Sequence, residues 1–460
     1  MKEKNSLFLI LLGVAAGVTS IFIPGTLFIF LCIFIISVLI KSFAKEEDKS
    51  FILSIFLIGM GVRVLLALIL YFLSIYLHIG YEYCDGRACD PLIVDRYALG
   101  VIGDSAFTSL RGWWLAQVWH GNIERSWFRL EDMVYAPRDH HFRIYAAFYY
   151  LFGFSQFAAK LINSLFSVGA AVLIYYIAKD IFEQRVAKLA AILAAFFPTI
   201  VLWSVTHLKE PINSFFICLT IFSIHRLIFL KKKSYLLLLI ISFANIFVRY
   251  SLGIFTLCFA LLSLIIGLSR NKYFRLAIVL LICSVMMTSL GREKVKSAET
   301  KLISEINGLI YAQRGVVSAG GAVYQIYPED FEGLSSIKQL FSLDFMAAAA
   351  KGVIFFLLTP FPWQISSKLQ LLSYPQVILW YLLFAFALVG IIFSLRYYFK
   401  ESCLILVFLF FSVLLSSLVS GNIGSAMRHR DITTPLILLF SAAGLVSHFS
   451  SRKENEYCFD

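Results

Sequence analysis

The stretch FILSIFLIGMGVRVLLALILYFLSIYLH, residues 51–78, decides the fold class of this chain. An α-helix needs only about 20 mostly apolar residues to cross the hydrocarbon core of a bilayer, and this run is longer. Comparable apolar runs recur along the whole sequence. They are continuous rather than alternating with polar residues, which excludes a transmembrane β-barrel. The sequence therefore predicts an all-α polytopic membrane protein.

Composition supports a membrane protein over a soluble one. Hydrophobic residues make up 60% of the chain and charged residues 15%, whereas soluble domains are roughly 45–50% apolar and 25% charged. The net charge of +12 does not indicate nucleic-acid binding, because Lys and Arg are expected to collect in the cytoplasmic loops of membrane proteins and no basic nucleic-acid-binding module is visible.

The apolar runs predict about 12 transmembrane helices. The expected ranges are 7–22, 25–41, 51–78, 155–181, 187–206, 211–230, 234–250, 252–268, 275–291, 376–395, 401–419 and 433–449. They divide the chain into four parts: an N-terminal hairpin (1–50), a core with a first outer loop at 79–154 (51–291), a second outer segment (292–375) and C-terminal helices (376–460). No cleavable signal peptide is evident, so we expect the first run to remain as an anchor.

Short basic loops set the expected orientation. The clusters that fall on one side include Lys41/Lys45, Arg185/Lys188, Lys231–Lys233, Arg270–Arg275 and Arg396/Lys400. The positive-inside rule assigns that side, and both termini, to the cytoplasm, and the two long segments then lie outside. Residues 347–362 are predicted to form a re-entrant or interfacial helix; if they crossed the membrane, everything after them would invert. We expect a multi-pass protein of a bacterial-type cytoplasmic (inner) membrane.

The first outer loop holds the most informative residues. Asp104 is a good helix N-cap and Gly121 a good stop, and the residues between them carry a Trp-rich apolar stripe suited to a membrane interface. Arg111 shares the polar face with Asp104. Asp104 is either a helix cap alone or a carboxylate held at the membrane surface as a general base.

Other residues of this loop suggest secondary roles. Cys84 and Cys89 can form a disulfide if the loop is extracytoplasmic. Asp139, His140 and His141 can coordinate a divalent metal, although adjacent His side chains rarely point the same way, and no metal site or other cofactor is certain. Arg111, His141 and Arg143 are candidates for contacts with an acceptor.

Several weak motifs, taken in order, resemble one known family. They are the acidic residue that opens a helix in the first outer loop, YYLFG at 149–153, KLIN at 160–163, AAFFP at 194–198, Trp203-Ser204, Lys209-Glu210, and GNIGSAMRHRDITTP at 421–435. This order is similar to that of GT-C fold glycosyltransferases that use polyprenyl-phosphate sugars, a group with bacterial relatives of protein O-mannosyltransferases and aminoarabinose transferases. The resemblance covers about residues 51–270 and returns at 421–435.

The resemblance implies transfer of a hexose or pentose from a lipid-phosphate donor to an extracytoplasmic glycan, lipid or protein acceptor. Asp104 corresponds to the acidic residue that the family uses as base or to orient the acceptor, and Glu210 is a second carboxylate or a partner of Lys209. Many relatives have two adjacent acidic residues where this chain has Asp104-Ser105, which leaves metal dependence open. Cations for the carrier phosphate are expected among the following residues: Arg249, Arg428, Arg430, Lys209 and His207.

Each of these residues also has a purely structural interpretation. Arg249 can snorkel to the interface, Arg428 and Arg430 can be ordinary loop charges, and Glu210 before Pro211 can simply mark a helix start. Two other functions stay open. One is a transporter or flippase of a lipid-linked or polar substrate. The other is an O-antigen polymerase or ligase, whose chemistry would fall to Arg314, Tyr324 and Glu329.

Overall fold

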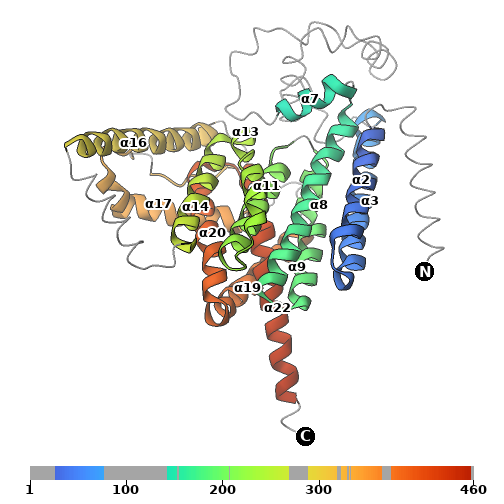
Figure 1. Ribbon diagram of the computed structural model, residues 1–460. Helices are drawn as coiled ribbons and strands as arrows, with labels where there is room; N and C mark the ends of the chain where they lie inside the picture. Colours follow the sequence, from blue (N-terminus) through green and yellow to red (C-terminus); the bar gives the residue numbers. More distant parts are fainter. Residues whose placement is uncertain are drawn as a thin grey trace, which may run out of the picture. The chain divides into compact units, whose positions relative to one another are not determined.

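The computed structural model describes residues 26–76, 142–152, 155–206, 208–268, 289–318, 323–328, 331, 333–364 and 374–456. Within these ranges the chain is almost entirely helical, apart from an isolated antiparallel bridge between Val323 and Asn422 (Figure 1). Six helices are long and apolar enough to cross a membrane, or up to eight if each of two bent pairs counts as one span. The predicted all-α membrane fold is thus confirmed. The count of 12 is not, because the ranges 7–22 and most of 275–291 lie outside the described residues.

Most of the predicted apolar ranges that the structure describes coincide with helices. The range 234–250 is instead divided into three short pieces, and the helices at 142–152, 289–318 and 423–430 lie largely outside the predicted ranges. The longer helices are α2 (Thr26–Phe43), α3 (Glu46–Tyr76), α7 (Phe142–Phe152), α8 (Gln156–Ile181), α9 (Gln184–Phe196), α11 (Glu210–Ile228), α14 (Tyr250–Leu268), α16 (Ser289–Ser318), α17 (Leu343–Leu358), α19 (Tyr374–Tyr397), α20 (Phe399–Val419), α21 (Ile423–Arg430) and α22 (Thr434–Glu456). Shorter turns are α10 (Pro198–Ser204), η3 (Lys233–Tyr235), α12 (Leu236–Ser242), α13 (Asn245–Val248), η4 (Ile337–Phe341) and η5 (Pro362–Gln364).

These helices belong to two compact units. The first comprises residues Met1–Tyr176, Ala191–Cys218 and Ser242–Ile254, and the second comprises Ile177–Ala190, Leu219–Ile241 and Phe255–Asp460. Several helices, among them α8 and α11, therefore begin in the first unit and end in the second.

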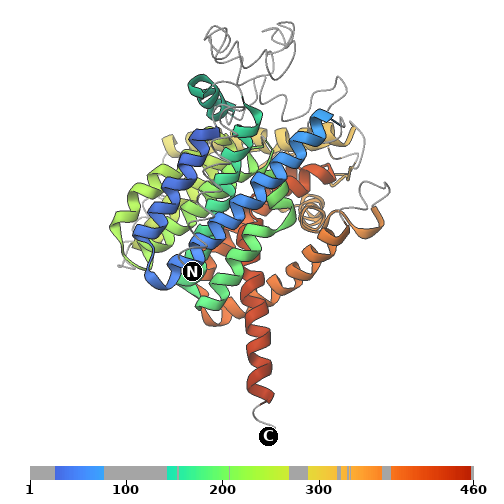
Figure 2. The same ribbon diagram turned by 90° about the vertical axis from the view of Figure 1, so that its right-hand side faces the viewer.

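The first unit contains the α2–α3 hairpin, whose two helices are in contact (Figure 1) and diverge away from their turn (Figure 2). It also contains a break in the chain after α9. Pro198 has no backbone N–H to continue a helix, and α9 and α10 meet there at an angle of 51°. The predicted span 187–206 therefore corresponds to two helices, which together are long and apolar enough for one bent span.

The second unit is organised by a close crossing of α19 and α22. A Cβ atom added to Gly390 would lie 1.9 Å from the carbonyl oxygen of Phe440, and one added to Gly444 would lie 2.0 Å from that of Phe386. Small residues allow such close backbone approach between membrane helices. Gly390 and Gly444 therefore fix how these two helices cross.

The remaining helices of the second unit carry the expected second outer segment. The long helix α16 lies crosswise to α20, and α17 packs against α20 and α21 (Figure 1). α17 covers the stretch expected to be a re-entrant or interfacial helix, and its 16 residues are shorter than those of the helices long enough to span a membrane. Their shared core includes Ile310, Tyr324, Phe345, Phe356 and Leu418.

Candidate active site

One face of α8 is polar although the helix is apolar enough to span a membrane. Lys160, Asn163, Ser164 and Ser167 recur at helical spacing, and none of them is more than 3% exposed. Polar side chains buried at membrane depth are costly unless they are hydrogen-bonded, and they mark functional sites by default. This face of α8 is therefore the centre of the candidate site.

Asn163 holds the connecting segment, residues 205–209, that joins α10 to α11. Its side-chain nitrogen donates to the carbonyl oxygens of Thr206 and, at 2.8 Å, Leu208. Its side-chain oxygen accepts a 2.7 Å hydrogen bond from the Tyr145 hydroxyl of α7. Backbone carbonyls next to a helix end need hydrogen-bond donors from outside the helix. The Asn163 side chain is the donor for two such carbonyls. Thr206 and Leu208 are thus fixed to α8.

The connecting segment ends at the two charged residues that the sequence singled out. Glu210 is the first residue of α11 and is 2% exposed, while Lys209 is half-buried. The Asn213 side chain donates to the Lys209 carbonyl at 3.0 Å. A carboxylate in the first helical turn interacts favourably with the helix dipole, which accounts in part for a buried glutamate at this position. The helix dipole at the start of α11 therefore stabilises the buried carboxylate of Glu210.

Arg63 of α3 is a cation that sequence reasoning did not single out. Its side chain is fully buried, and its guanidinium donates to Ser204 Oγ at 2.9 Å, Ser167 Oγ at 2.9 Å, and two backbone carbonyls, those of Ala195 at 2.9 Å and Gly59 at 3.1 Å. In the described part of the chain, no carboxylate forms an ion pair with it. A charged side chain at the centre of a membrane helix costs at least about 2.5–3.5 kcal/mol, so four hydrogen bonds are needed to retain it.

Two other predicted residues belong to the first unit. Arg249 is half-buried and is the C-cap of α13, directly before α14. Arg143 is exposed on α7. Neither forms an ion pair with a described carboxylate.

The second unit contains Arg428 and Arg430, which lie in α21 rather than in a loop. Arg430 is 1% exposed, and its Nη1 donates to the carbonyls of Leu357 at 2.7 Å and Thr359 at 3.0 Å. Its guanidinium carbon lies 4.3 Å from the centre of the Trp380 ring. A cation is favourable at a helix C-terminus, where carbonyls lack partners. Arg430 therefore closes the end of α17, and Arg428, which is half-buried, is the more accessible of the two.

Aromatic side chains complete the closure of α17. The Trp380 ring nitrogen donates to the Leu357 carbonyl at 2.8 Å, and the Tyr381 hydroxyl donates to that of Leu358 at 2.6 Å. Burial raises the pKa of the Tyr324 hydroxyl, and a side-chain hydrogen bond with Ser420 and the charge of the nearby Arg430 guanidinium offset part of that rise. The hydroxyl of Tyr324 therefore stays protonated across the physiological pH range.

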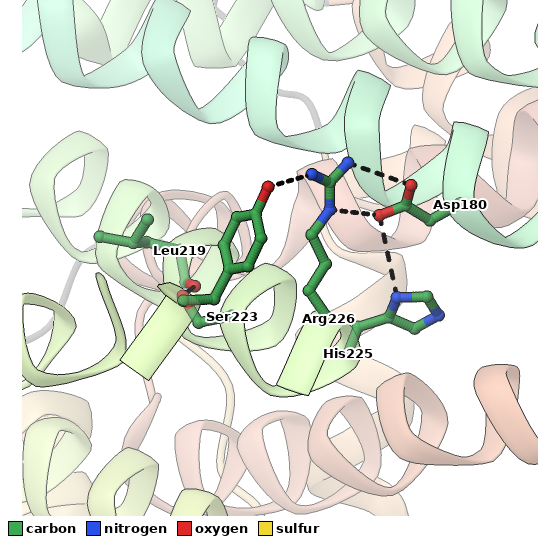
Figure 3. Close-up of polar contacts among 6 residues, drawn as sticks. Asp180, Leu219, Ser223, His225 and Arg226 are labelled. Carbon is green, nitrogen blue, oxygen red and sulfur yellow. Dashed lines mark hydrogen bonds and ion pairs between the residues drawn. The ribbon is translucent and has the colours of Figure 1, made fainter. Parts of the chain in front are cut away.

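A half-buried charge cluster lies at the other end of α8, within the second unit. Arg226 of α11 binds Asp180 of α8 through two hydrogen bonds, 2.7 Å from Nε and 3.1 Å from Nη2, as Figure 3 shows. The same guanidinium contacts the Tyr235 hydroxyl and the Phe222 ring. His225 Nδ1 lies 3.9 Å from Asp180 Oδ2 (Figure 3). Bidentate geometry and flanking rings are typical of a structural arginine.

Several predicted residues lie outside the described part of the chain: Asp104, Arg111, His141, His207, Cys84 and Cys89. Their roles remain predictions. Among the residues that the structure describes, no three His, Cys, Asp or Glu side chains are grouped so that they could hold a metal ion. Lys209 and Glu210 are neighbours in the sequence, and the structure places them directly after a residue, Leu208, that Asn163 of α8 holds by a hydrogen bond.

Comparison with known proteins bears on this same region. Residues 141–289 match the model of the dolichyl-phosphate-mannose-protein mannosyltransferase family. No curated protein and no solved structure matches the chain. The match contains α7, the polar face of α8, the break at Pro198 and the Lys209–Glu210 pair. It confirms the resemblance over this part of the chain and supports a membrane glycosyltransferase of the GT-C type that uses a lipid-linked donor.

Proposed function

We propose that this protein transfers a sugar from a polyprenyl-phosphate-linked donor to an acceptor on the extracytoplasmic side of the membrane. The match of residues 141–289 to the mannosyltransferase family carries the proposal. Among the residues it covers are a buried carboxylate, Glu210, and a half-buried cation, Lys209, at one end of a membrane helix. This is the pairing of charges that a lipid-phosphate donor and a hydroxyl acceptor require.

The transfer step assigns distinct work to carboxylates and cations. The acceptor hydroxyl attacks the anomeric carbon of the sugar and forms the new glycosidic bond, and the bond from that carbon to the phosphate oxygen breaks. The polyprenyl phosphate leaves with the electron pair, and the hydroxyl proton goes to a carboxylate. We assign the role of base to Asp104, with Glu210 as the second carboxylate.

Cations must neutralise the charge that develops on the leaving phosphate. We assign this to Lys209 and Arg249, and to Arg428 among the arginines of α21. Arg430 is a weaker candidate, because two of its hydrogen bonds already close the end of α17 and its side chain is 1% exposed. His207 stays a candidate from the sequence alone.

The test is transfer of radiolabelled sugar by the purified protein in proteoliposomes, from a panel of polyprenyl-phosphate sugars to membrane-derived acceptors. We expect wild type to transfer sugar, Asp104→Asn to lose at least about 100-fold in kcat, and Glu210→Gln to lose about 10-fold or more. The matched control is Glu183→Gln, an exposed carboxylate just before α9, which should behave as wild type. Full activity in both Asp104→Asn and Glu210→Gln would refute the assigned residues.

Two broken helix pairs are the observation that supports the transporter alternative. The pairs formed by α9 with α10 and by α21 with α22 are bent by 51° and 68°, and interrupted helices are common at transporter binding sites. In the same proteoliposomes, substrate-dependent flux without any covalent transfer would favour a transporter. Covalent transfer without flux would favour the enzyme.

A further inference from the structure

Arg63 has no role in the proposed transfer, yet its guanidinium makes four hydrogen bonds inside the first unit. It lies in α3, within a candidate membrane span of 25 residues, Glu46–Leu70. A buried guanidinium in such a helix is expected to pair with an acid or with backbone carbonyls. Here its partners are two serine hydroxyls and two backbone carbonyls. Its charge is therefore used to join helices rather than to balance a carboxylate.

The partners of Arg63 surround the break between α9 and α10. The Ala195 carbonyl lies at the end of α9, where the bend at Pro198 removes the helical partner that the next turn would supply. Arg63 Nη1 donates to this carbonyl at 2.9 Å. In a membrane interior no water is present to satisfy such a group, so a neighbouring helix must do so. Arg63 thus makes the break tolerable at membrane depth.

The same guanidinium also holds the C-terminal end of α10, which leads into the connecting segment. Arg63 Nε donates to Ser204 Oγ at 2.9 Å, and that hydroxyl in turn donates to the Val201 carbonyl at 2.6 Å. Ser164 of α8 donates to the Ser204 carbonyl at 3.1 Å. The end of α9 and the end of α10 are therefore both fixed by side chains of α3 and α8. The connecting segment, residues 205–209, starts directly from this fixed point.

We infer that Arg63 is a positioning residue that sets the placement of Lys209 and Glu210 through α10 and the connecting segment. Only five residues separate Ser204 from Glu210, and two of them are fixed by Asn163. A displacement of α10 therefore also displaces Glu210. This inference rests on the proposed function, because it concerns the placement of the residues assigned to transfer.

The same proteoliposome assay tests the inference with graded substitutions of Arg63. Arg63→Met keeps an unbranched apolar side chain but removes the guanidinium with every one of its hydrogen bonds, and Arg63→Lys keeps the charge but not the planar fork. Because misplacement of about 1 Å can cost about 100-fold in rate, we expect kcat to fall roughly 10- to 100-fold in Arg63→Met. The KM for the lipid donor should rise as well, because Lys209, which is assigned to the donor phosphate, is displaced together with Glu210. Arg63→Lys should recover part of the loss. The control is Arg185→Met, an exposed arginine in α9, with both constants unchanged.

A second measurement reports the accessibility of the connecting segment and does not depend on transfer activity. In a Lys209→Cys background, a membrane-impermeant maleimide should label the introduced thiol several-fold faster when Arg63 is replaced by Met. The same chain with Lys209 retained gives the background from the native cysteines.

If Arg63→Met fails to fold, Ser204→Ala replaces it in both measurements, with smaller changes in the same direction. Unchanged kcat and unchanged labelling in a folded variant would overturn the inference. If wild type transfers no sugar, the proposed function fails, and the labelling rates alone decide whether Arg63 positions the segment.

Discussion

Replacing Gly390 with alanine should destabilise the second unit strongly, because no room exists for one more carbon atom. The new Cβ would lie 1.9 Å from the Phe440 carbonyl oxygen, where ordinary contacts begin at 3.4 Å. The obstacle is backbone, so it cannot rotate away. α19 and α22 must separate by about 1.5 Å, the difference between those two distances, and a gap of about 0.5–1 Å already loses a quarter to a half of each van der Waals contact.

The cost should therefore reach the upper end of the range for overpacking, about 3 kcal/mol. For a unit of this size that corresponds to a fall of roughly 6 °C or more in the unfolding midpoint. Gly444→Ala should cost a similar amount, because its own Cβ would meet the Phe386 carbonyl oxygen at 2.0 Å. The double variant should cost less than the sum, because the first substitution already separates the helices.

The assay is thermal unfolding of the detergent-solubilised protein, followed by size-exclusion chromatography of the heated samples. Gly61→Ala is the matched control, because Gly61 also lies in a membrane helix but a Cβ there would meet nothing within 4 Å. Alanine favours helix by about 0.8–1 kcal/mol over glycine, so this control should be neutral or slightly stabilised. Equal midpoints for Gly390→Ala and Gly61→Ala would refute the packing argument.

The buried polar contacts give three further predictions. Asp180→Asn should cost about 1.5–3 kcal/mol in the free energy of unfolding, because both charge-assisted hydrogen bonds to Arg226 weaken. A double-mutant cycle with Arg226→Met should give a coupling energy above roughly 1 kcal/mol; strict additivity would contradict it. Asn163→Ala should open the connecting segment to proteolysis and cost about 1–3 kcal/mol for each carbonyl left unpaired, and unchanged digestion would count against this assignment. Arg430→Lys should lower the unfolding midpoint despite keeping the charge, because lysine cannot stack on Trp380 while reaching two carbonyls, and an unchanged midpoint would show that charge alone suffices.

Much of the fold was predictable because lipid leaves few choices to an apolar run. Ranges such as 51–78 and 155–181 coincide with α3 and α8 to within a few residues, since a segment with no water around it must satisfy its backbone as a helix. The breaks were harder to predict. The run 187–206 looked like one span because its hydropathy is continuous, and only Pro198 marks where α9 ends.

The site was predictable in its residues but not in its contacts. Lys209 and Glu210 stand out as charges beside apolar runs, and the structure places them at the start of α11. Their support comes from Asn163 and Arg63, which lie 45 and 141 residues away in sequence from the groups they bind. No periodicity links such distant positions. The available signal for Arg63 was a lone cation inside an apolar run, and such a residue is a functional candidate by default.

The hydrogen bonds around the break between α9 and α10 also have a consequence for biogenesis. The side chains of α3 and α8 that donate to residues 195–208 come from Arg63, Asn163 and Ser164, and all three precede that segment in the chain. A ribosome therefore delivers the donors to the membrane before the carbonyls that need them. At the end of α17 the order is reversed, because Trp380, Tyr381 and Arg430 emerge after the carbonyls they close.

Chains halted during synthesis should therefore acquire the two structures at different lengths. A nascent chain stopped shortly after α11 should already protect the connecting segment from protease, since domains form as their residues appear. The end of α17 should stay sensitive to protease until α21 has entered the membrane. Because the hydrogen-bond donors of this segment precede its carbonyls in the chain, the first unit should begin to assemble before the C-terminal helices have been made.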